Sequence, residues 1–245
     1  MNHLAFALAL IQGSAMATSQ ASADLKQLED ASNKGDVATV ERLLTARPDW
    51  ADARDGSGAS LLLQAHVRRR TEVVDAFAKR RTTFDVFEAS ALGRIRELAA
   101  AVNEKKAVVN TMSGNGFRAL ALAAFYSHPE AVALLVSAGA EVNAYSVTAR
   151  VQALHAAAAS RCLECSKILL SAGADPNAPQ DEGFRPLHEA ALNDDRALAE
   201  LLIAHGARRE IKTDKGQTSV DVARQYGHQA LADWLAAAPA RPESR

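Results

Sequence analysis

The sequence predicts an all-α solenoid of about seven helix–turn–helix repeats joined by short β-hairpin-like turns. Two observations predict it: a set of residues recurs with steps of 33 or 34, and each period holds two short helical patterns. The recurring residues are leucines (Leu120, Leu154, Leu187), Gly-Ala pairs (Gly139-Ala140, Gly173-Ala174, Gly206-Ala207) and asparagines (Asn110, Asn143, Asn177). Three markers that keep one register indicate a repeated structural unit.

Each period contains a small apolar helix, a second helix and a turn. The first helix is expected in ALALAAFYS at residues 119–127, and the second in HPEAVALLVSAG at residues 128–139. Gly139 ends the second segment, as glycine commonly ends helices. Turn residues such as SGNG at 113–116 and DEG at 181–183 separate the periods. Helices this short are unstable alone, so neighbouring repeats must bury one another's apolar faces.

This pattern resembles the ankyrin repeat, whose consensus runs G-x-T-P-L-H-x-A-A, then G-H, V-x-x-L-L and G-A-x-x-N. The resemblance is strongest at residues 183–207 (GFRPLHEAAL…LAELLIAHGA), followed by residues 116–144 and 153–178. Residues 215–235 resemble a final capping repeat, with Asp221 in place of the histidine. Before residue 111, helix-pair spacing and fragments of the consensus carry the resemblance.

The resemblance implies a repeat array over residues 24–239 and a short tail at residues 240–245. The approximate repeats are 24–54, 55–83, 84–112, 113–145, 146–179, 180–212 and 213–239. Residues 1–23 are expected to be an N-terminal arm or a signal peptide. The apolar segment Leu4–Ile11 and two A-x-A sites favour a signal peptide, but the first three residues carry no Lys or Arg. We expect a cytoplasmic protein, or a periplasmic or secreted one if residues 1–23 are cleaved.

Composition argues against several classes of protein. The net charge of −1 gives no bulk attraction to nucleic acid or to an anionic membrane. Apolar runs fall short of the roughly 20 residues that span a bilayer. The sequence shows no phosphate loop, nucleophile elbow, zinc signature or paired catalytic carboxylates. We therefore expect a monomer with no catalytic residues, no cofactor and no metal site.

The histidines of the repeats invite a catalytic or metal-binding interpretation. The resemblance instead places His155 and His188 in the T-P-L-H turn and His128 and His228 in the G-H turn, where it implies structural hydrogen bonds. Equivalent side chains on neighbouring repeats should lie on the order of 10 Å apart. That separation is too large for two ligands of one metal ion, each of which binds at about 2.1 Å.

Cys162 and Cys165 form a CxxC motif at the expected start of a second helix. A helix N-terminus and the neighbouring Arg161 would favour a reactive thiolate, so one interpretation is a thiol redox pair. The other interpretation is a pair of small, partly buried residues at a helix junction. The first gives the alternative function for the chain, a thiol redox factor that uses Cys162 and Cys165.

The two runs of basic residues and the two tryptophans can each be interpreted structurally or functionally. The runs Arg68–Arg70 and Lys79–Arg81 either bind an acidic partner or place cations at helix ends, where the helix dipole favours them. Trp50 and Trp234 are expected in the core or in the caps of the array.

Aromatic residues at the turns and first helices are the candidate binding surface. Phe117 and Phe184 follow turn glycines, Phe125 and Tyr126 end a first helix, and Tyr145 lies in the next turn. The ankyrin resemblance implies that such positions line a concave groove, and aromatic residues are favoured interface anchors. Packing within the repeats is the alternative, above all for Phe125. With Asn193, these residues are predicted to bind a protein partner, which makes the chain a non-catalytic protein-interaction scaffold.

Overall fold

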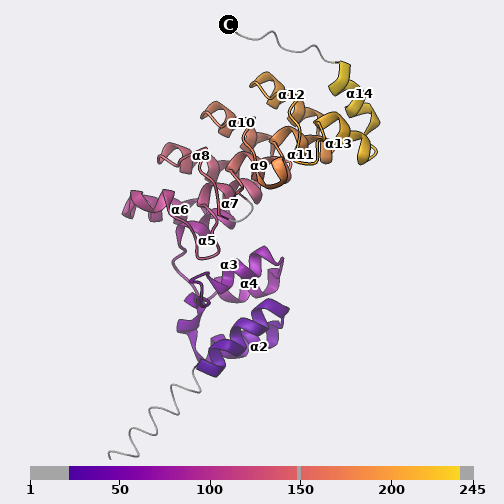
Figure 1. Cartoon of the computed structure of the whole chain (residues 1–245). Coiled ribbons are helices and arrows are strands. Elements are labelled where there is room, and N and C mark those ends of the chain that lie inside the picture. Colours follow the sequence, from indigo (N-terminus) through magenta and orange to yellow (C-terminus); the bar gives the residue numbers. More distant parts are fainter. Residues whose placement is uncertain (1–21, 148–149, 238–245) are drawn as a thin grey trace, which may run out of the picture. The chain divides into compact units, whose positions relative to one another are not determined.

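The computed structural model describes residues 22–147 and 150–237, and its elements there are helices and turns (Figure 1). The chain divides into two compact units, the first ending at Thr83 and the second beginning at Phe84. We call residues 22–83 the N-terminal subdomain and residues 84–237 the C-terminal subdomain. The predicted tail at 240–245 lies outside the described residues. So does the predicted arm or signal peptide at 1–23, except for residues 22 and 23, which belong to the first helix.

The N-terminal subdomain consists of two helix pairs and a connecting 3-10 helix. The first pair is a helix at residues 22–34 with α2 (Val37–Ala46), and the second is α3 (Leu61–Val67) with α4 (Thr71–Ala78). The 3-10 helix η1 (Pro48–Asp52) contacts α2, α3 and α4 and buries Trp50, in agreement with the predicted core position.

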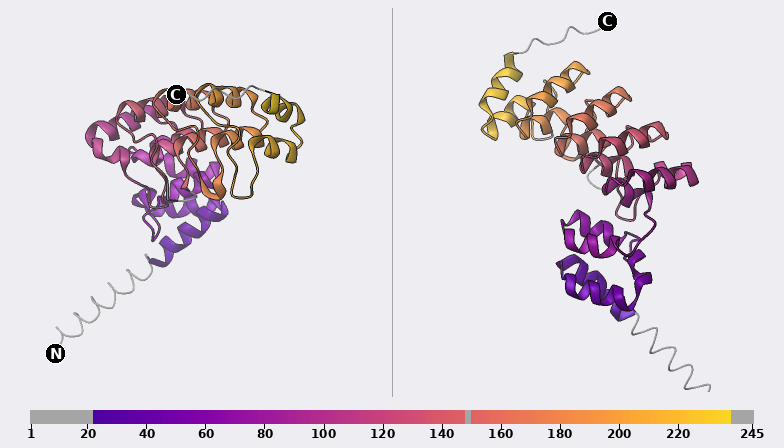
Figure 2. Two further views of the ribbon diagram at one scale, coloured as in Figure 1. Left: turned by 45° about the horizontal axis from the view of Figure 1, so that its top comes forward. Right: turned by 180° about the vertical axis from the view of Figure 1, so that it is seen from behind.

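The C-terminal subdomain stacks its helix pairs in two layers (Figures 1 and 2). The first helices of the pairs are α5 (Val86–Ala91), α7 (Ala119–Phe125), α9 (Ala153–Ala159), α11 (Pro186–Leu192) and α13 (Ser219–Gln225). The second helices are α6 (Ile95–Glu104), α8 (Pro129–Ser137), α10 (Leu163–Ser171), α12 (Arg196–Ala204) and α14 (Gln229–Ala237). Short 3-10 helices, η2 (Lys106–Asn110) and η4 (Asp181–Gly183), lie in the connections. Each first helix packs on the next first helix, and α6, α8, α10 and α12 pack on one another in the same order.

Local sequence determines where several of these helices begin. In the capping box of α5, the Asp85 carboxylate accepts the N–H of Glu88 at 2.8 Å, and the Glu88 carboxylate accepts the N–H of Asp85 at 3.0 Å. Thr218 caps α13 in the same way, with Asp221 as its partner. Pro186 begins α11, where its missing N–H removes no helical hydrogen bond.

Small buried side chains let the first helices approach closely. Every residue from Ala119 to Ala124 in α7 is buried, and so is every residue from Ala153 to Ala158 in α9. The marker leucines are buried as well: Leu120, Leu154 and Leu187. Alanines and leucines together fill the space between successive pairs, as close packing in a protein interior requires.

The predicted all-α fold class is confirmed, because helix pairs stack on one another within each of the two units. These residues contain no strand but two isolated antiparallel bridges, Arg54–Ser60 and Met112–Arg118, which close hairpin-like turns. Seven successive helix pairs lie in the described part of the chain. The predicted repeat boundaries, and with them the number of repeats, stay a prediction.

Candidate functional site

Two of the recurring sequence markers, the asparagines and the loops with the Gly-Ala pairs, hydrogen-bond to each other between neighbouring helix pairs. The Asn143 side chain donates to the carbonyl of Gly173 at 2.9 Å and accepts the N–H of Asp175 at 2.9 Å. Asn110 does the same with Gly139 (3.0 Å) and Glu141 (2.9 Å). Asn177 does so with Gly206 (2.9 Å) and Arg208 (2.8 Å). The asparagines thus pair with the loops that contain the recurring Gly-Ala, which explains why both markers keep one register.

His155 and His188 are structural residues of the turn before a first helix. His155 Nδ1 accepts the N–H of Gln152 at 3.4 Å, so the proton lies on Nε2, which donates to the carbonyl of Ala178 in the next pair at 2.9 Å. His188 Nδ1 accepts the N–H of Arg185 at 3.0 Å. Burial lowers the pKa of His155 to about 4 and also lowers the pKa of His188. Both rings are therefore neutral near pH 7.

His128 and His228 make a second contact, directed at the preceding pair. His128 Nε2 lies 3.1 Å from the carbonyl oxygen of Ala91, and His228 Nε2 lies 3.0 Å from that of Leu192. Both carbonyls belong to the last residue of a first helix, where no helical partner exists. These histidines therefore connect each helix pair to the end of the preceding first helix.

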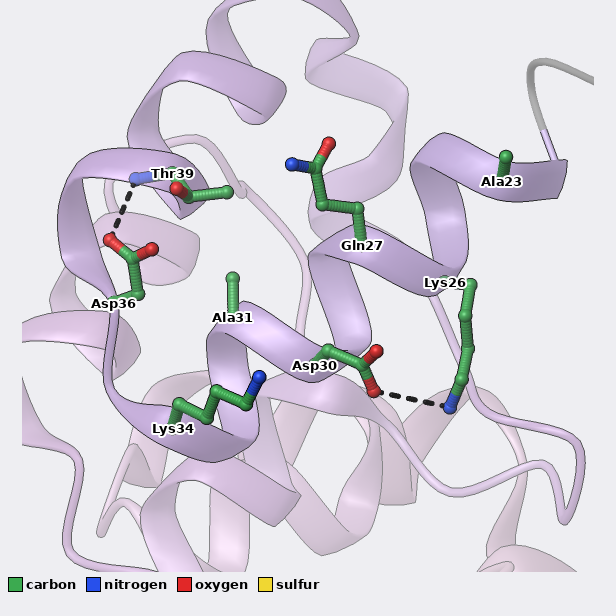
Figure 3. A pocket seen from close by; sticks show the side chains of 8 residues that line it. All are labelled: Ala23, Lys26, Gln27, Asp30, Ala31, Lys34, Asp36 and Thr39. Atoms are coloured by element: carbon green, nitrogen blue, oxygen red, sulfur yellow. Dashed lines mark hydrogen bonds and ion pairs between the residues drawn. The ribbon is translucent and has the colours of Figure 1, made fainter.

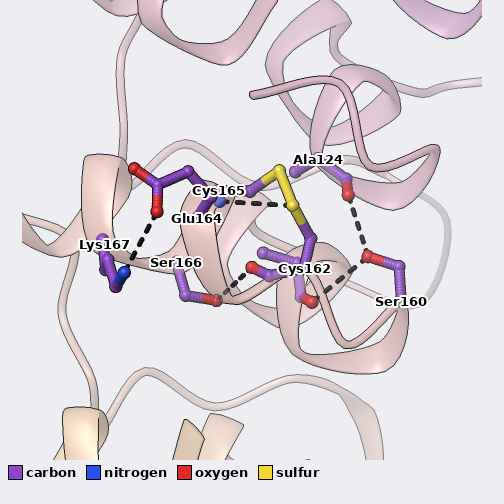
Figure 4. The surroundings of a disulfide bond; sticks show 8 residues. Ala124, Ser160, Cys162, Glu164, Cys165, Ser166 and Lys167 are labelled. Atoms are coloured by element: carbon purple, nitrogen blue, oxygen red, sulfur yellow. Dashed lines mark hydrogen bonds and ion pairs between the residues drawn. A yellow bond between two sulfur atoms is a disulfide. The ribbon is translucent and has the colours of Figure 1, made fainter. Parts of the chain in front are cut away.

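Cys162 occupies the same position as His128 and His228 but does not make this contact (Figure 4). The Ser160 hydroxyl instead donates to the carbonyl of Ala124, the residue before the last one of α7, at 2.9 Å. Cys162 forms a disulfide with Cys165 across the first turn of α10, with Cα atoms 5.3 Å apart. Its sulfur also accepts the N–H of Cys165 at 3.2 Å, which makes Cys162 the N-cap of α10.

The six predicted binding residues form two groups at opposite ends of the first helices. Phe125, Tyr126 and Asn193 lie at the C-terminal ends: Phe125 is the last residue of α7, and Tyr126 and Asn193 cap α7 and α11. Phe117, Tyr145 and Phe184 lie in the turns that precede first helices. A helix of seven residues separates the two ends by about 10 Å.

Phe125 is exposed over 48% of its surface, so the alternative that it packs between helices is wrong. Its ring meets that of the half-buried Tyr126 edge to face, with centroids 5.2 Å apart. Edge-to-face contact is a favoured arrangement of two aromatic rings. The two residues therefore offer a paired aromatic surface at the end of α7.

The three turn residues are half-buried. Phe184 lies 5.5 Å from the His188 ring, between centroids. Arg150 lies over the Tyr145 ring at 5.2 Å, while the Tyr145 carbonyl accepts from Arg118 Nε at 3.0 Å. Phe117 directly precedes Arg118, which caps α7. The rings of Tyr145 and Phe184 thus contact neighbouring side chains as well as presenting part of their surface.

Sequence reasoning missed that the ends of the first helices form a continuous uncharged row. We call this row the first-helix stripe: Leu92, Phe125, Tyr126, Ala159, Ser160, Leu192, Asn193, Gln225 and Tyr226. Each member ends or caps a first helix, and the first helices pack on one another in order. Tyr226, which is 55% exposed, could have been found by adding 33 to Asn193. The second helices instead expose ion pairs such as Arg196–Glu200, at 2.9 Å.

The two runs of basic residues follow helices α3 and α4. Arg68 donates to the carbonyl of Gln64 at 3.3 Å, and Arg80 donates to the carbonyl of Ala76 at 2.9 Å, each within its own helix end. Arg81 pairs with Asp52 at 2.8 Å. The helix-end interpretation is therefore confirmed for Arg68 and Arg80, whereas Arg81 pairs with the carboxylate of Asp52 beyond the end of α4.

A pocket on the first helix pair holds no catalytic arrangement (Figure 3). Of the groups that line it, Lys26 pairs with Asp30 at 3.2 Å and Asp36 caps α2 by accepting the N–H of Thr39 at 3.1 Å. Within the described ranges, no group of three or more His, Cys, Asp or Glu side chains could hold a metal ion. No helix in the described part of the chain is long and apolar enough to cross a membrane.

Comparison with known proteins agrees with this geometry. A family model described as "Ankyrin repeats (3 copies)" matches residues 86–180 and 154–245, which together make up more than half of the chain. No match was found among the curated proteins.

Proposed function

Because the chain belongs to the ankyrin repeat family, whose repeats are generally protein-interaction modules, we propose that it is a non-catalytic scaffold that binds a protein partner. We propose that it acts as a monomer. The first-helix stripe of the C-terminal subdomain provides one edge of the binding surface. The turn residues Phe117, Tyr145 and Phe184 provide the other edge, so that the partner occupies the concave groove that ankyrin repeats line with these positions.

The observation that carries this proposal is the exposed, rigid aromatic pair within an uncharged row. Phe125 is half exposed within the stripe, and its ring packs edge to face on that of Tyr126. Exposed aromatic residues held by a rigid scaffold lose little entropy on binding and are frequent hot spots. Because the stripe carries no charge, we expect it to contact an uncharged, apolar segment of the partner.

The polar side chains that could do chemistry are already used for stacking. His128, His155 and His228 each face a backbone carbonyl of a neighbouring pair, and Asn143 satisfies two backbone groups. A buried, hydrogen-bonded side chain of this kind is explained by its structural contacts. This division of roles supports recognition as the function.

Site-specific photo-crosslinking in the native host tests the proposal and identifies the partner. A photoreactive amino acid replaces Phe125, and the control places it at Ala133, which is exposed on the second helix α8. We expect one protein to crosslink from position 125 and not from position 133, because only position 125 lies in the stripe. Mass spectrometry identifies the crosslinked protein.

Titration of the captured protein, once purified, against two variants completes the test. Phe125→Ala should weaken binding by at least about tenfold, as expected of an interface anchor. Val67→Ala is the matched control, since Val67 is an exposed apolar residue that ends the first helix α3 in the N-terminal subdomain. Equal crosslinking from both positions, or an unchanged Kd for Phe125→Ala, would refute the proposed surface.

A further inference from the structure

We propose that the Cys162–Cys165 disulfide exchanges with low-molecular-weight thiols, with Cys162 as the reacting sulfur and Cys165 as the resolving sulfur. This activity is separate from partner binding. It arises from two cysteines at the N-terminus of α10 that the stacking of the repeats does not require.

The contacts around Ser160 show that the cysteines are free of the stacking role. At the equivalent position, His128 and His228 each reach the last carbonyl of the preceding first helix. In this pair Ser160 reaches the carbonyl of Ala124, one residue before the end of the preceding first helix, at 2.9 Å (Figure 4). The bond between the repeats therefore persists whether the two sulfurs are oxidised or reduced.

The two cysteine residues differ in exposure to solvent. Cys162 keeps 9% of its surface exposed, whereas Cys165 is completely buried. Thiol–disulfide exchange requires an in-line approach to one sulfur, so an external thiol meets Cys162 first. Cys165 then lies within one helical turn of Cys162, in position to displace whatever Cys162 has bound.

The N-terminus of α10 also favours Cys162 as the sulfur that carries negative charge. The N–H of Cys165 points at the Cys162 sulfur at 3.2 Å, and it would hydrogen-bond the thiolate after reduction. The neighbouring Arg161 has a side chain that is 59% exposed, although Asp195 lies 3.9 Å from its Nε. The other nearby charges, Glu164 and Lys167, neutralise each other at 3.1 Å.

The exchange balances with a thiol and its disulfide as co-reactants. A thiolate RS⁻ attacks Cys162 Sγ, the Cys162–Cys165 bond breaks, and Cys165 leaves as a thiolate that takes a proton from solvent. A second RS⁻ attacks the outer sulfur of the mixed disulfide, which releases RSSR and the Cys162 thiolate. In reverse, the Cys162 thiolate attacks RSSR and expels RS⁻, after which Cys165 displaces the second RS⁻ and restores the disulfide.

The test uses the full chain, oxidised glutathione and two single variants. After reduction and removal of the reductant, Cys165→Ser should accumulate one glutathione adduct per chain, at Cys162. Cys162→Ser should react at least about tenfold more slowly, because its remaining thiol is buried. The wild type should return to the disulfide without a lasting adduct. Each variant is the matched control of the other, since both lack the disulfide.

Reduced wild type provides a second measurement that does not depend on either variant folding. A short exposure to iodoacetamide, followed by peptide mapping, should find the label on Cys162 before Cys165. Equal rates for the two cysteines, or no reaction until urea unfolds the chain, would overturn the proposal. Circular dichroism of both variants checks that their helices are intact.

Discussion

Asn143 shows how one side chain holds two helix pairs in register. Its amide donates to the carbonyl of Gly173 and accepts the N–H of Asp175, so two backbone groups of the next loop depend on it. We predict that Asn143→Ala lowers the free energy of unfolding by about 1–3 kcal/mol, because both groups lose their partner. Urea unfolding followed by circular dichroism measures this change.

Asn103 is the matched control for that substitution, since it is exposed on α6. Asn103→Ala should leave stability within about 0.5 kcal/mol of wild type. Equal effects of the two substitutions would show that the asparagine contacts between the pairs contribute nothing to stability.

His155 makes the stability of the chain depend on pH. Burial lowers its pKa to about 4 from an ordinary value of 6.5, so the unfolded chain binds a proton first as the pH falls. The stabilisation by neutral His155 is complete above about pH 6.5 and is lost toward pH 4, by up to about 3 kcal/mol. His155→Gln, which cannot titrate, should flatten the plot of unfolding free energy against pH in this window.

Two other buried groups also titrate, so the test compares the slope of unfolding free energy against pH in His155→Gln with the slope in wild type. His188 has a lowered pKa and should leave part of the slope in place, while burial raises the pKa of Glu189, which acts in the opposite direction. His205→Gln is the control, because His205 is exposed at the end of α12. A slope for His155→Gln that equals the wild-type slope would contradict the assignment of this pH dependence to His155.

At the scale of the helix pair, the loop between the two helices requires a left-handed residue. Gly93 and Gly227 meet this requirement with φ of 64° and 82°, whereas Ser127, Arg161 and Asp194 adopt φ of 59°, 58° and 52° with a side chain. A residue other than glycine is strained there. The three loops between those of Gly93 and Gly227 thus contain this strain.

We predict that Ser127→Gly raises the free energy of unfolding by about 0.5–1 kcal/mol, because it relieves the left-handed strain. Gly227→Ala should lower it by about 1 kcal/mol. An added Cβ at Gly227 meets no atom within 4 Å, so its effect reports the backbone alone. Thermal or urea unfolding measures both changes, and a loss of stability in Ser127→Gly would disprove the explanation.

The helix pairs and their turns could be predicted from sequence because their signals repeat. The step of 33 or 34 residues located the leucines, the Gly-Ala pairs and the asparagines. The partnership between Asn143 and Gly173 could not be read from them, since spacing does not say which residues touch. The replacement of a histidine contact by Ser160 was also hidden, because the serine lies two positions before the histidine position.

The binding surface could be predicted only in part, for a reason of geometry. Phe125 is the last residue of a seven-residue helix, and two turns are too few for periodicity to distinguish a buried position from an exposed one. The row that includes Tyr226 becomes visible only when the helix ends are aligned in space. Sequence reasoning therefore found the aromatic anchors but not the stripe that connects them.

At the scale of the whole molecule, folding and recognition use different side chains. Within the C-terminal subdomain, asparagines and histidines connect successive pairs, and alanines and leucines fill the layer between them. The first-helix stripe lies outside these contacts for most of its length, with Ser160 and Leu192 as shared members. A scaffold of this kind can vary its exposed row without losing its fold.

Hydrogen exchange of the free chain and of its complex with the captured partner tests this separation most directly. The account predicts that the partner slows amide exchange at the ends of the first helices α7, α9, α11 and α13. Exchange in the second helices α8, α10 and α12 should stay as it is in the free chain. Protection confined to those second helices, or to the N-terminal subdomain, would contradict the account.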